Sequence, residues 1–146
     1  MKFMTRTIIS AIMLIAFLAI GGCSNSNLSS TVTDTENSMI LGYLDFKVMT
    51  ANFGGKVFSA YKLLGRDSDM LYIWANIQEY YKKNGLVEQG SGWSVPLVLN
   101  LTKSDDVVSI AGHKSPGDGS LYSKDIKIIF PKELQKTILF FPSNST

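Results

Sequence analysis

The amino-acid sequence predicts an α+β domain, in which an antiparallel sheet of about five strands has one face covered by two short C-terminal helical segments. Between residues 40 and 113, apolar residues alternate with polar ones in short runs that turn residues separate, a pattern typical of antiparallel strands. After the Pro- and Gly-rich stretch 115–119, the apolar spacing changes to that of an amphipathic helix. The change of period places the helices after the sheet.

Strands are expected in five segments: 40–49, 56–64, 70–83, 86–101 and 107–113. Segment 70–83 also has a helical interpretation, with Gly85 ending the helix, but its β-branched and aromatic content favours a strand. Asn84-Gly85 is a strong signal for a hairpin turn. Pro96 cannot donate a hydrogen bond to a neighbouring strand, so we expect it at a strand start or on a sheet edge.

The two helical segments follow residue 120. Tyr122, Ile126 and Ile129 lie on one face of a helix by their spacing, and Pro131 then interrupts the pattern. A second helix with a similar spacing, built on Leu134 and Ile138, is expected to end before Pro142.

The N-terminal stretch has the features of a secretory signal peptide. Lys2 and Arg6 precede an uncharged apolar run, residues 8–20, that would cover about 20 Å as a helix, which is less than the roughly 30 Å of a bilayer core. The run ends in Ile20-Gly21-Gly22-Cys23, and Cys23 is the only cysteine of the chain.

These four residues resemble the lipobox of bacterial lipoproteins. The resemblance implies that a lipoprotein signal peptidase recognises Ile20, Gly21 and Gly22 and cleaves before Cys23. It also implies that Cys23 carries diacylglycerol and a fatty acid such as palmitate. The partner would then be membrane lipid, and the protein would be anchored on the extracytoplasmic face of a cell membrane.

Three parts of the chain are expected: a signal peptide at 1–22, a lipidated Cys23 with a flexible polar tether to residue 39, and a single extracytoplasmic domain at 40–146. The tether is predicted from its Ser, Thr and Asn content, which offers little to bury. Without the two basic residues of the leader, the remaining 12 basic residues balance the 12 acidic ones, so the charge gives no support for nucleic acid as a partner.

A loop before the first predicted helix is a candidate anion site. Backbone N–H groups at a glycine-rich turn that leads into a helix can bind an anion, and a nearby Lys and His would help. The alternative is that Asp118 or Ser120 caps the helix and that the glycines only permit the turn. The candidate residues are Gly112, His113, Lys114, Gly117, Asp118 and Gly119.

The aromatic side chains of Tyr72, Trp74, Tyr80 and Trp93 are a second candidate site. They pack in the core if they lie under the C-terminal helices, and they form a binding surface if they face outward.

The function expected from these observations is a non-catalytic binding or envelope-accessory module, held at the membrane by Cys23. His113 is the only histidine, which excludes a site with two His ligands, and no cofactor is expected. No nucleophile elbow surrounds a serine. The alternatives are a small extracytoplasmic enzyme and an anion-binding domain that uses the loop 112–120.

Overall fold

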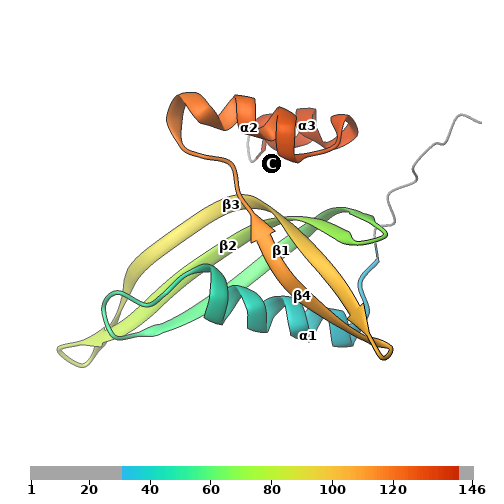
Figure 1. Ribbon diagram of the computed structural model, residues 1–146. Helices are drawn as coiled ribbons and strands as arrows, with labels where there is room; N and C mark the ends of the chain where they lie inside the picture. Colours follow the sequence, from blue (N-terminus) through green and yellow to red (C-terminus); the bar gives the residue numbers. More distant parts are fainter. Residues whose placement is uncertain (1–30, 142–146) are drawn as a thin grey trace, which may run out of the picture.

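The computed structural model describes residues 31–141, which form a four-stranded antiparallel sheet with helices on both faces (Figure 1). The strands pair in the order β1-β2-β3-β4, which confirms an α+β fold with an antiparallel sheet. The strands are β1 (Lys56–Asp67), β2 (Met70–Lys83), β3 (Leu86–Ser104) and β4 (Val107–Lys114). The helical segments are α1 (Asp34–Tyr43), the π-helical η1 (Leu44–Val48), the 3-10 turn η2 (Gly119–Leu121), α2 (Tyr122–Ile129) and α3 (Lys132–Leu139).

Two-residue turns join the later strands. Asn84 and Gly85, between β2 and β3, have φ angles of 52° and 80°, and Asp105 and Asp106, between β3 and β4, have φ angles of 47° and 66°. Such left-handed pairs match the twist of the flanking strands and fix a tight antiparallel hairpin. The hairpin turn predicted at Asn84-Gly85 is confirmed.

Segment 70–83 is a strand along its whole length, as its composition predicted. Leu71, Ile73 and Ala75 are completely buried on one face, while Tyr72 and Trp74 are buried on the other with exposed fractions of 4% and 5%. A strand with both faces buried must be covered by another layer on each side.

Helix α1 and η1 cover the first face. Ile40 and Leu44 are completely buried there, against Leu71, Ile73 and other residues of β2 and β3. The predicted strand 40–49 is therefore wrong, and the sheet has four strands instead of about five. Ile40 and Leu44 are four residues apart, which suits a helix face as well as a strand face, whereas Phe46, which a strand would place on the same face as Leu44, is 83% exposed.

The start of α1 explains why this segment is helical. Thr33 and Glu36 form a capping box, in which Thr33 Oγ1 accepts a hydrogen bond from Glu36 N and Glu36 accepts one from Thr33 N. Arg66, next to a bulge of β1, donates to both oxygens of Glu36 at 3.1 and 2.5 Å. The hydrogen bond from Arg66 lowers the pKa of Glu36 to about 2. Residues 34–39, expected in the flexible tether, therefore belong to the folded domain.

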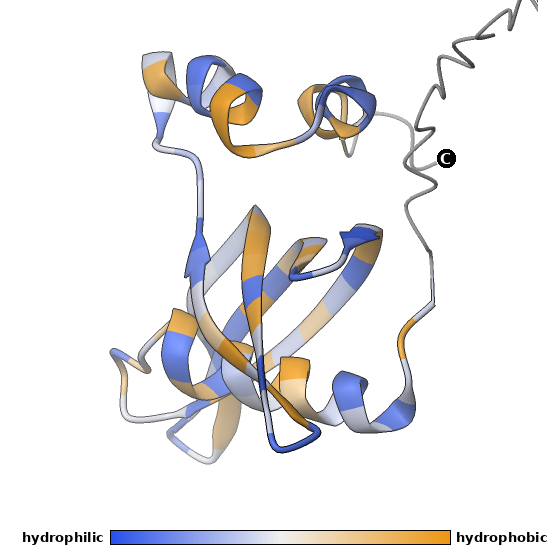
Figure 2. Cartoon of the chain, turned by 45° about the vertical axis from the view of Figure 1, so that its right-hand side comes forward, coloured by the Kyte–Doolittle hydropathy of each residue, from blue (hydrophilic) through white to orange (hydrophobic). Residues whose placement is uncertain are grey.

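The C-terminal helices α2 and α3 cover part of the second face, as predicted. Ile126, Phe130, Leu134 and Ile138 are buried against Tyr72, Trp74 and Val98 in a second core. Figure 2 shows these helices as a separate layer, each with a hydrophobic side. No helix within residues 31–141 is long and apolar enough to cross a membrane.

Candidate functional site

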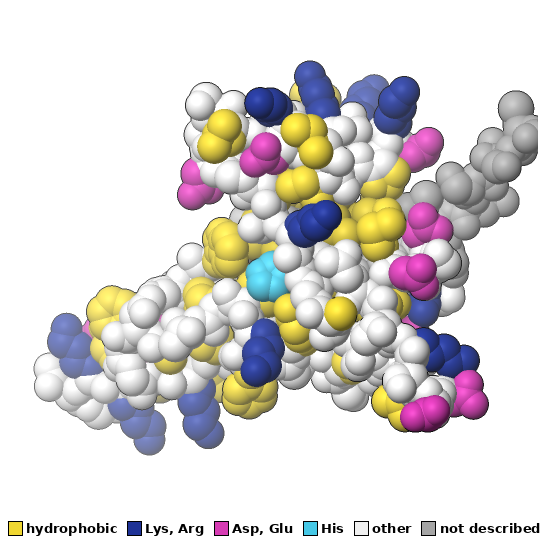
Figure 3. Space-filling view, viewed as in Figure 1, with side chains coloured by type: hydrophobic (Ala, Val, Ile, Leu, Met, Phe, Trp, Pro, Cys, Tyr) yellow, Lys and Arg dark blue, Asp and Glu magenta, His cyan; other side chains and the backbone are white. Residues whose placement is uncertain are grey.

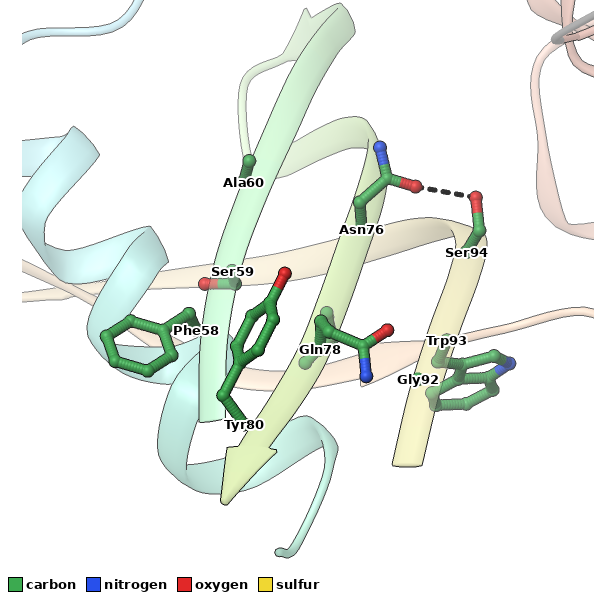
Figure 4. A pocket seen from close by; sticks show the side chains of 10 residues that line it. Phe58, Ser59, Ala60, Asn76, Gln78, Tyr80, Gly92, Trp93 and Ser94 are labelled. Carbon is green, nitrogen blue, oxygen red and sulfur yellow. Dashed lines mark hydrogen bonds between the residues drawn. The ribbon is translucent and has the colours of Figure 1, made fainter. Parts of the chain in front are cut away.

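A groove lies on the part of the second sheet face next to α2 and α3. Its volume is about 550 Å³, and it crosses β1, β2 and β3 (Figure 4). We call it the sheet groove. Its lining residues are Phe58, Ser59, Ala60, Asn76, Ile77, Gln78, Tyr80, Gly92, Trp93 and Ser94.

Small and polar side chains keep the groove open. The strand register aligns Ala60, Asn76 and Ser94 in one row across the sheet, and all three are exposed. In the neighbouring row, Trp74 opposes Pro96 and packs under the C-terminal helices. The groove therefore begins where large apolar side chains give way to small ones.

A short hydrogen-bond chain orients Asn76. Trp74 Nε1 donates to Ser94 Oγ at 2.9 Å, and Ser94 Oγ donates to Asn76 Oδ1 at 2.6 Å. The amide oxygen of Asn76 is thereby occupied, and its Nδ2 donor points away from Ser94 (Figure 4). Asn76 therefore presents a hydrogen-bond donor at the groove.

Gln78 is held in the complementary way. Its Nε2 donates to the carbonyls of Glu79, Gly90 and Ser91 at 3.0 to 3.1 Å, which leaves Oε1 as an acceptor. A Cβ atom at Gly92 would lie only 2.4 Å from this oxygen, so the absence of a side chain at Gly92 makes room for the amide. The floor therefore presents one donor and one acceptor.

Aromatic rings border the groove. Phe58 is 54% exposed and Tyr80 is 37% exposed, and their rings meet edge to face with centroids 5.9 Å apart. Trp93 lies on the part of β3 that has no β4 partner, because β4 pairs with β3 only from Val98 onward. Pro96 is on the same free part, so the predicted edge position is confirmed.

The comparisons with known proteins add nothing. No protein-family model, curated protein or solved structure matches this chain.

The predicted aromatic set is divided between two locations. Tyr72 and Trp74 are buried in the second core, where burial chiefly raises the pKa of Tyr72. Tyr80 and Trp93 line the sheet groove. Sequence reasoning missed Phe58, Asn76, Gln78 and Ser94. The sequence did contain a signal for the groove. Along the strand face that begins with Tyr72 and Trp74, the large aromatic residues are followed by the polar residues Asn76 and Gln78.

The structure does not bring the candidate anion-binding residues together. His113 opposes Leu99 and lies on the α1 side, where its Nδ1 is 3.0 Å from the hydroxyl of Tyr43. Burial lowers the pKa of His113. Lys114 opposes Val98, a residue of the second core, so its side chain starts from the opposite face. Gly112 is part of β4.

An acidic side chain of α2 already lies against the loop. The carboxylate of Asp125 accepts a hydrogen bond from Gly117 N at 2.9 Å. Asp118 at the start of η2 forms no side-chain cap, and the residue that precedes α2 is Leu121 and not Ser120, so the alternative of a cap by Asp118 or Ser120 is not found either. Gly119, with a φ of 62°, begins η2. A negative carboxylate at this position opposes anion binding.

Glu79 is a second feature that sequence reasoning missed. Its side chain is completely buried opposite a bulge of β3 at Gly90 and Ser91, and its carboxylate accepts hydrogen bonds from four backbone N–H groups. The donors are Asn52 at 2.9 Å, Phe53 at 2.8 Å, Gly55 at 3.0 Å and Ser91 at 3.4 Å. Glu79 therefore fixes the loop before β1 beside the groove.

Two further observations concern the remaining candidates. Within residues 31–141, no three His, Cys, Asp or Glu side chains gather in a group that could hold a metal ion. Ile20, Gly21, Gly22 and Cys23 lie outside the described residues.

Proposed function

We propose that the protein is a lipid-anchored extracytoplasmic lipoprotein whose domain is a non-catalytic binding module, and that the sheet groove is its ligand site. The sheet groove carries this proposal. Its volume of about 550 Å³ lies in the range of small-molecule sites. It also combines apolar rings with a few fixed polar groups, which is the usual composition of such sites.

The groove chemistry favours a neutral ligand that carries hydroxyl or amide groups and has one apolar side. Asn76 offers a donor and Gln78 an acceptor, and neither group changes its charge with pH. The rings of Phe58 and Tyr80, which meet edge to face, provide an apolar border. A saccharide chain fits this combination, because it presents hydroxyl groups along its edges and C–H groups on its faces.

The hydrogen bonds of Ser94 favour binding over catalysis. Its hydroxyl donates a hydrogen bond to the amide oxygen of Asn76 and accepts one from Trp74. A nucleophilic serine would donate to a general base instead, and an amide is not a base that can take its proton. The lipobox-like residues 20–23 support the anchored location.

A titration with a neutral saccharide tests the ligand site. The probe is the trimer of N-acetylglucosamine, and the readout is the amide NMR spectrum of the mature protein. We expect shifts at Asn76, Gln78 and Gly92. Ala60→Trp should abolish them without unfolding the protein, because Ala60 is exposed and its larger replacement would fill the groove.

The matched pair Asn76→Ala and Asn100→Ala separates groove binding from general effects. Asn100, on β3, is on the same face of the sheet as Asn76 but lies outside the groove, opposite Met70. We expect weaker binding only in Asn76→Ala. Equal affinity in both variants, or shifts confined to other parts of the sheet, would contradict the proposed site.

A further inference from the structure

The far end of the sheet, around the β2–β3 hairpin, carries exposed apolar side chains next to lysines. Leu86 is 69% exposed, Val87 is 67% exposed and Phe53 is 58% exposed. A hollow of about 580 Å³ lies among these side chains, lined in part by Phe53, Tyr81, Val87 and two lysines. We call Phe53, Lys56, Tyr81, Lys82, Leu86 and Val87 the distal surface.

The backbone holds the distal surface in place. The turn at Asn84 and Gly85 places Leu86 and Val87 at the start of β3. The ring of Phe53 stacks on Tyr81 with centroids 5.1 Å apart and an interplanar angle of 17°. Because the amides of residues 52, 53 and 55 bind the buried carboxylate of Glu79, the loop that carries Phe53 is fixed. The apolar groups are therefore exposed in a defined arrangement.

The charge of this end is positive. Glu79 is buried, and Glu88 is 3.7 Å from Lys83 Nζ and accepts a hydrogen bond from Tyr81. Lys56 and Lys82 form no ion pair within the described part of the chain. Figure 3 shows Lys side chains around hydrophobic ones at the left, the end at which Figure 1 places the β2–β3 hairpin.

We propose that the distal surface docks onto an anionic lipid bilayer. Apolar and aromatic side chains on a protruding edge enter the interface, and flanking lysines contact the lipid phosphates while their stems cover apolar surface. The charge complementarity selects this partner. The inference goes beyond the ligand site and uses the proposed Cys23 anchor only to bring the domain to the membrane.

The length of the chain before the domain permits this contact. Residues 23–30 reach at most about 27 Å when extended, so the domain stays near the bilayer. The start of α1 and the β2–β3 turn lie at different ends of the sheet (Figure 1). A tether of this length lets the hairpin end touch the bilayer while the start of α1, beside Val107, stays above its surface.

The test uses a matched pair of valines at two hairpins. Val87 is 67% exposed and Val107 is 66% exposed, near the β2–β3 and β3–β4 turns respectively. The full lipidated protein, as Val87→Cys or Val107→Cys, is labelled with an environment-sensitive fluorophore and incorporated into vesicles. The vesicles contain phosphatidylcholine alone or with about one third phosphatidylglycerol, and a fraction of the lipid is brominated.

We expect a blue shift and bromine quenching of the label at position 87 on the anionic vesicles, weaker effects on neutral vesicles, and neither effect at position 107. Replacing Lys56 or Lys82 by Gln should lower the ratio of docked to undocked protein about fivefold each. The matching replacement of Lys132, an exposed residue of α3, should leave the ratio unchanged.

Three outcomes would overturn the inference. They are a solvent-like label at 87 on every vesicle, equal effects at 87 and 107, and burial of the label at 87 without lipid, which would indicate a protein partner or a second copy. Flotation of the labelled protein with the vesicles reports the Cys23 anchor separately. Failure of the anchor is thereby distinguished from failure of the distal surface.

Discussion

At the scale of single residues, Glu79 is the most unusual group of the described chain. Burial raises the pKa of its carboxyl group, but the backbone N–H donors of Asn52, Gly55, Phe53 and Ser91 together lower it by more, so the net pKa is below its usual range. The charged form is therefore the one that holds the loop 51–55 against β2 and β3.

The first prediction concerns Glu79→Gln. An amide cannot accept hydrogen bonds on both of its terminal atoms, so the thermal midpoint should fall at pH 7. A lowered folded-state pKa stabilises the protein above the unfolded pKa of about 4.3 and loses that effect as the pH falls through the folded value. The difference between wild type and variant should therefore shrink below about pH 4. Thermal unfolding between pH 3 and pH 8 measures it.

Glu133→Gln is the control for this change of charge, because Glu133 is exposed on α3. We expect its midpoint to follow the wild type. If Glu79→Gln also follows the wild type at all pH values, the carboxylate does not hold the loop.

At the scale of elements, the sheet faces are held to their helices by a few specific contacts. Tyr43 at the end of α1 meets His113 of β4 through a hydrogen bond of 3.0 Å and an edge-to-face ring contact of 5.8 Å. The other end of α1 is held through Glu36 and Arg66. Both ends of this short helix are therefore attached to the sheet beyond the apolar contacts of Ile40 and Leu44.

The second prediction concerns His113→Gln. Because burial lowers the pKa of His113, the unfolded chain binds a proton near pH 6.5 more readily than the folded one. The stability of the wild type should fall as the pH decreases from about 7 to 5, and this decrease should be smaller in the variant. Denaturant unfolding at several pH values measures both slopes. A steeper slope in the variant would contradict a buried neutral imidazole.

The elements also show why one sequence pattern was interpreted correctly and another was not. Segment 70–83 carries β-branched and aromatic residues over its 14 positions, and these residue types favour a strand. A helix would need apolar residues on one face only. In segment 40–49, Leu44, Phe46 and Val48 alternate as in a strand, but Ile40 and Leu44 also share a helix face. The choice depended on the capping box at Thr33, seven residues before the expected start of the domain.

At the scale of the whole molecule, two cores share the same two strands. The odd-numbered residues of β2 from Leu71 to Ile77 belong to the α1 core, and Tyr72 and Trp74 belong to the core under α2 and α3. Both cores are built on β2 and β3, so the loss of either helical layer would expose an apolar face of these strands. We therefore expect residues 31–141 to unfold as one unit.

The third prediction tests this unity with two isoleucines of α2. Ile126 is completely buried and Ile128 is 70% exposed. Ile126→Ala should lower the unfolding free energy by about 2–5 kcal/mol. Ile128→Ala should change it by less than about 0.5 kcal/mol. Circular dichroism and Trp fluorescence should report the same midpoint in each variant, and separate midpoints would show that the C-terminal helices unfold independently.

The fourth prediction concerns the anchor, which lies outside the described residues. Cys23→Ala removes the only thiol of the chain. Metabolic labelling with a fatty-acid probe should be lost, and the leader should remain uncleaved by the lipoprotein pathway. Unchanged labelling would exclude Cys23 as the lipidated residue.

The sequence by itself determined the class of the fold, the β2–β3 hairpin and the C-terminal helices. These features can be predicted because each depends on residues close together in the chain. The signals are the alternation of apolar and polar residues, the pair Asn84-Gly85, and the spacing of Ile126, Leu134 and Ile138. Only the tertiary structure decided which residues form the sheet groove, because Ala60, Asn76 and Ser94 are far apart in the chain and meet through strand register. It also placed His113 and Lys114 on opposite faces, since a strand turns consecutive side chains in opposite directions.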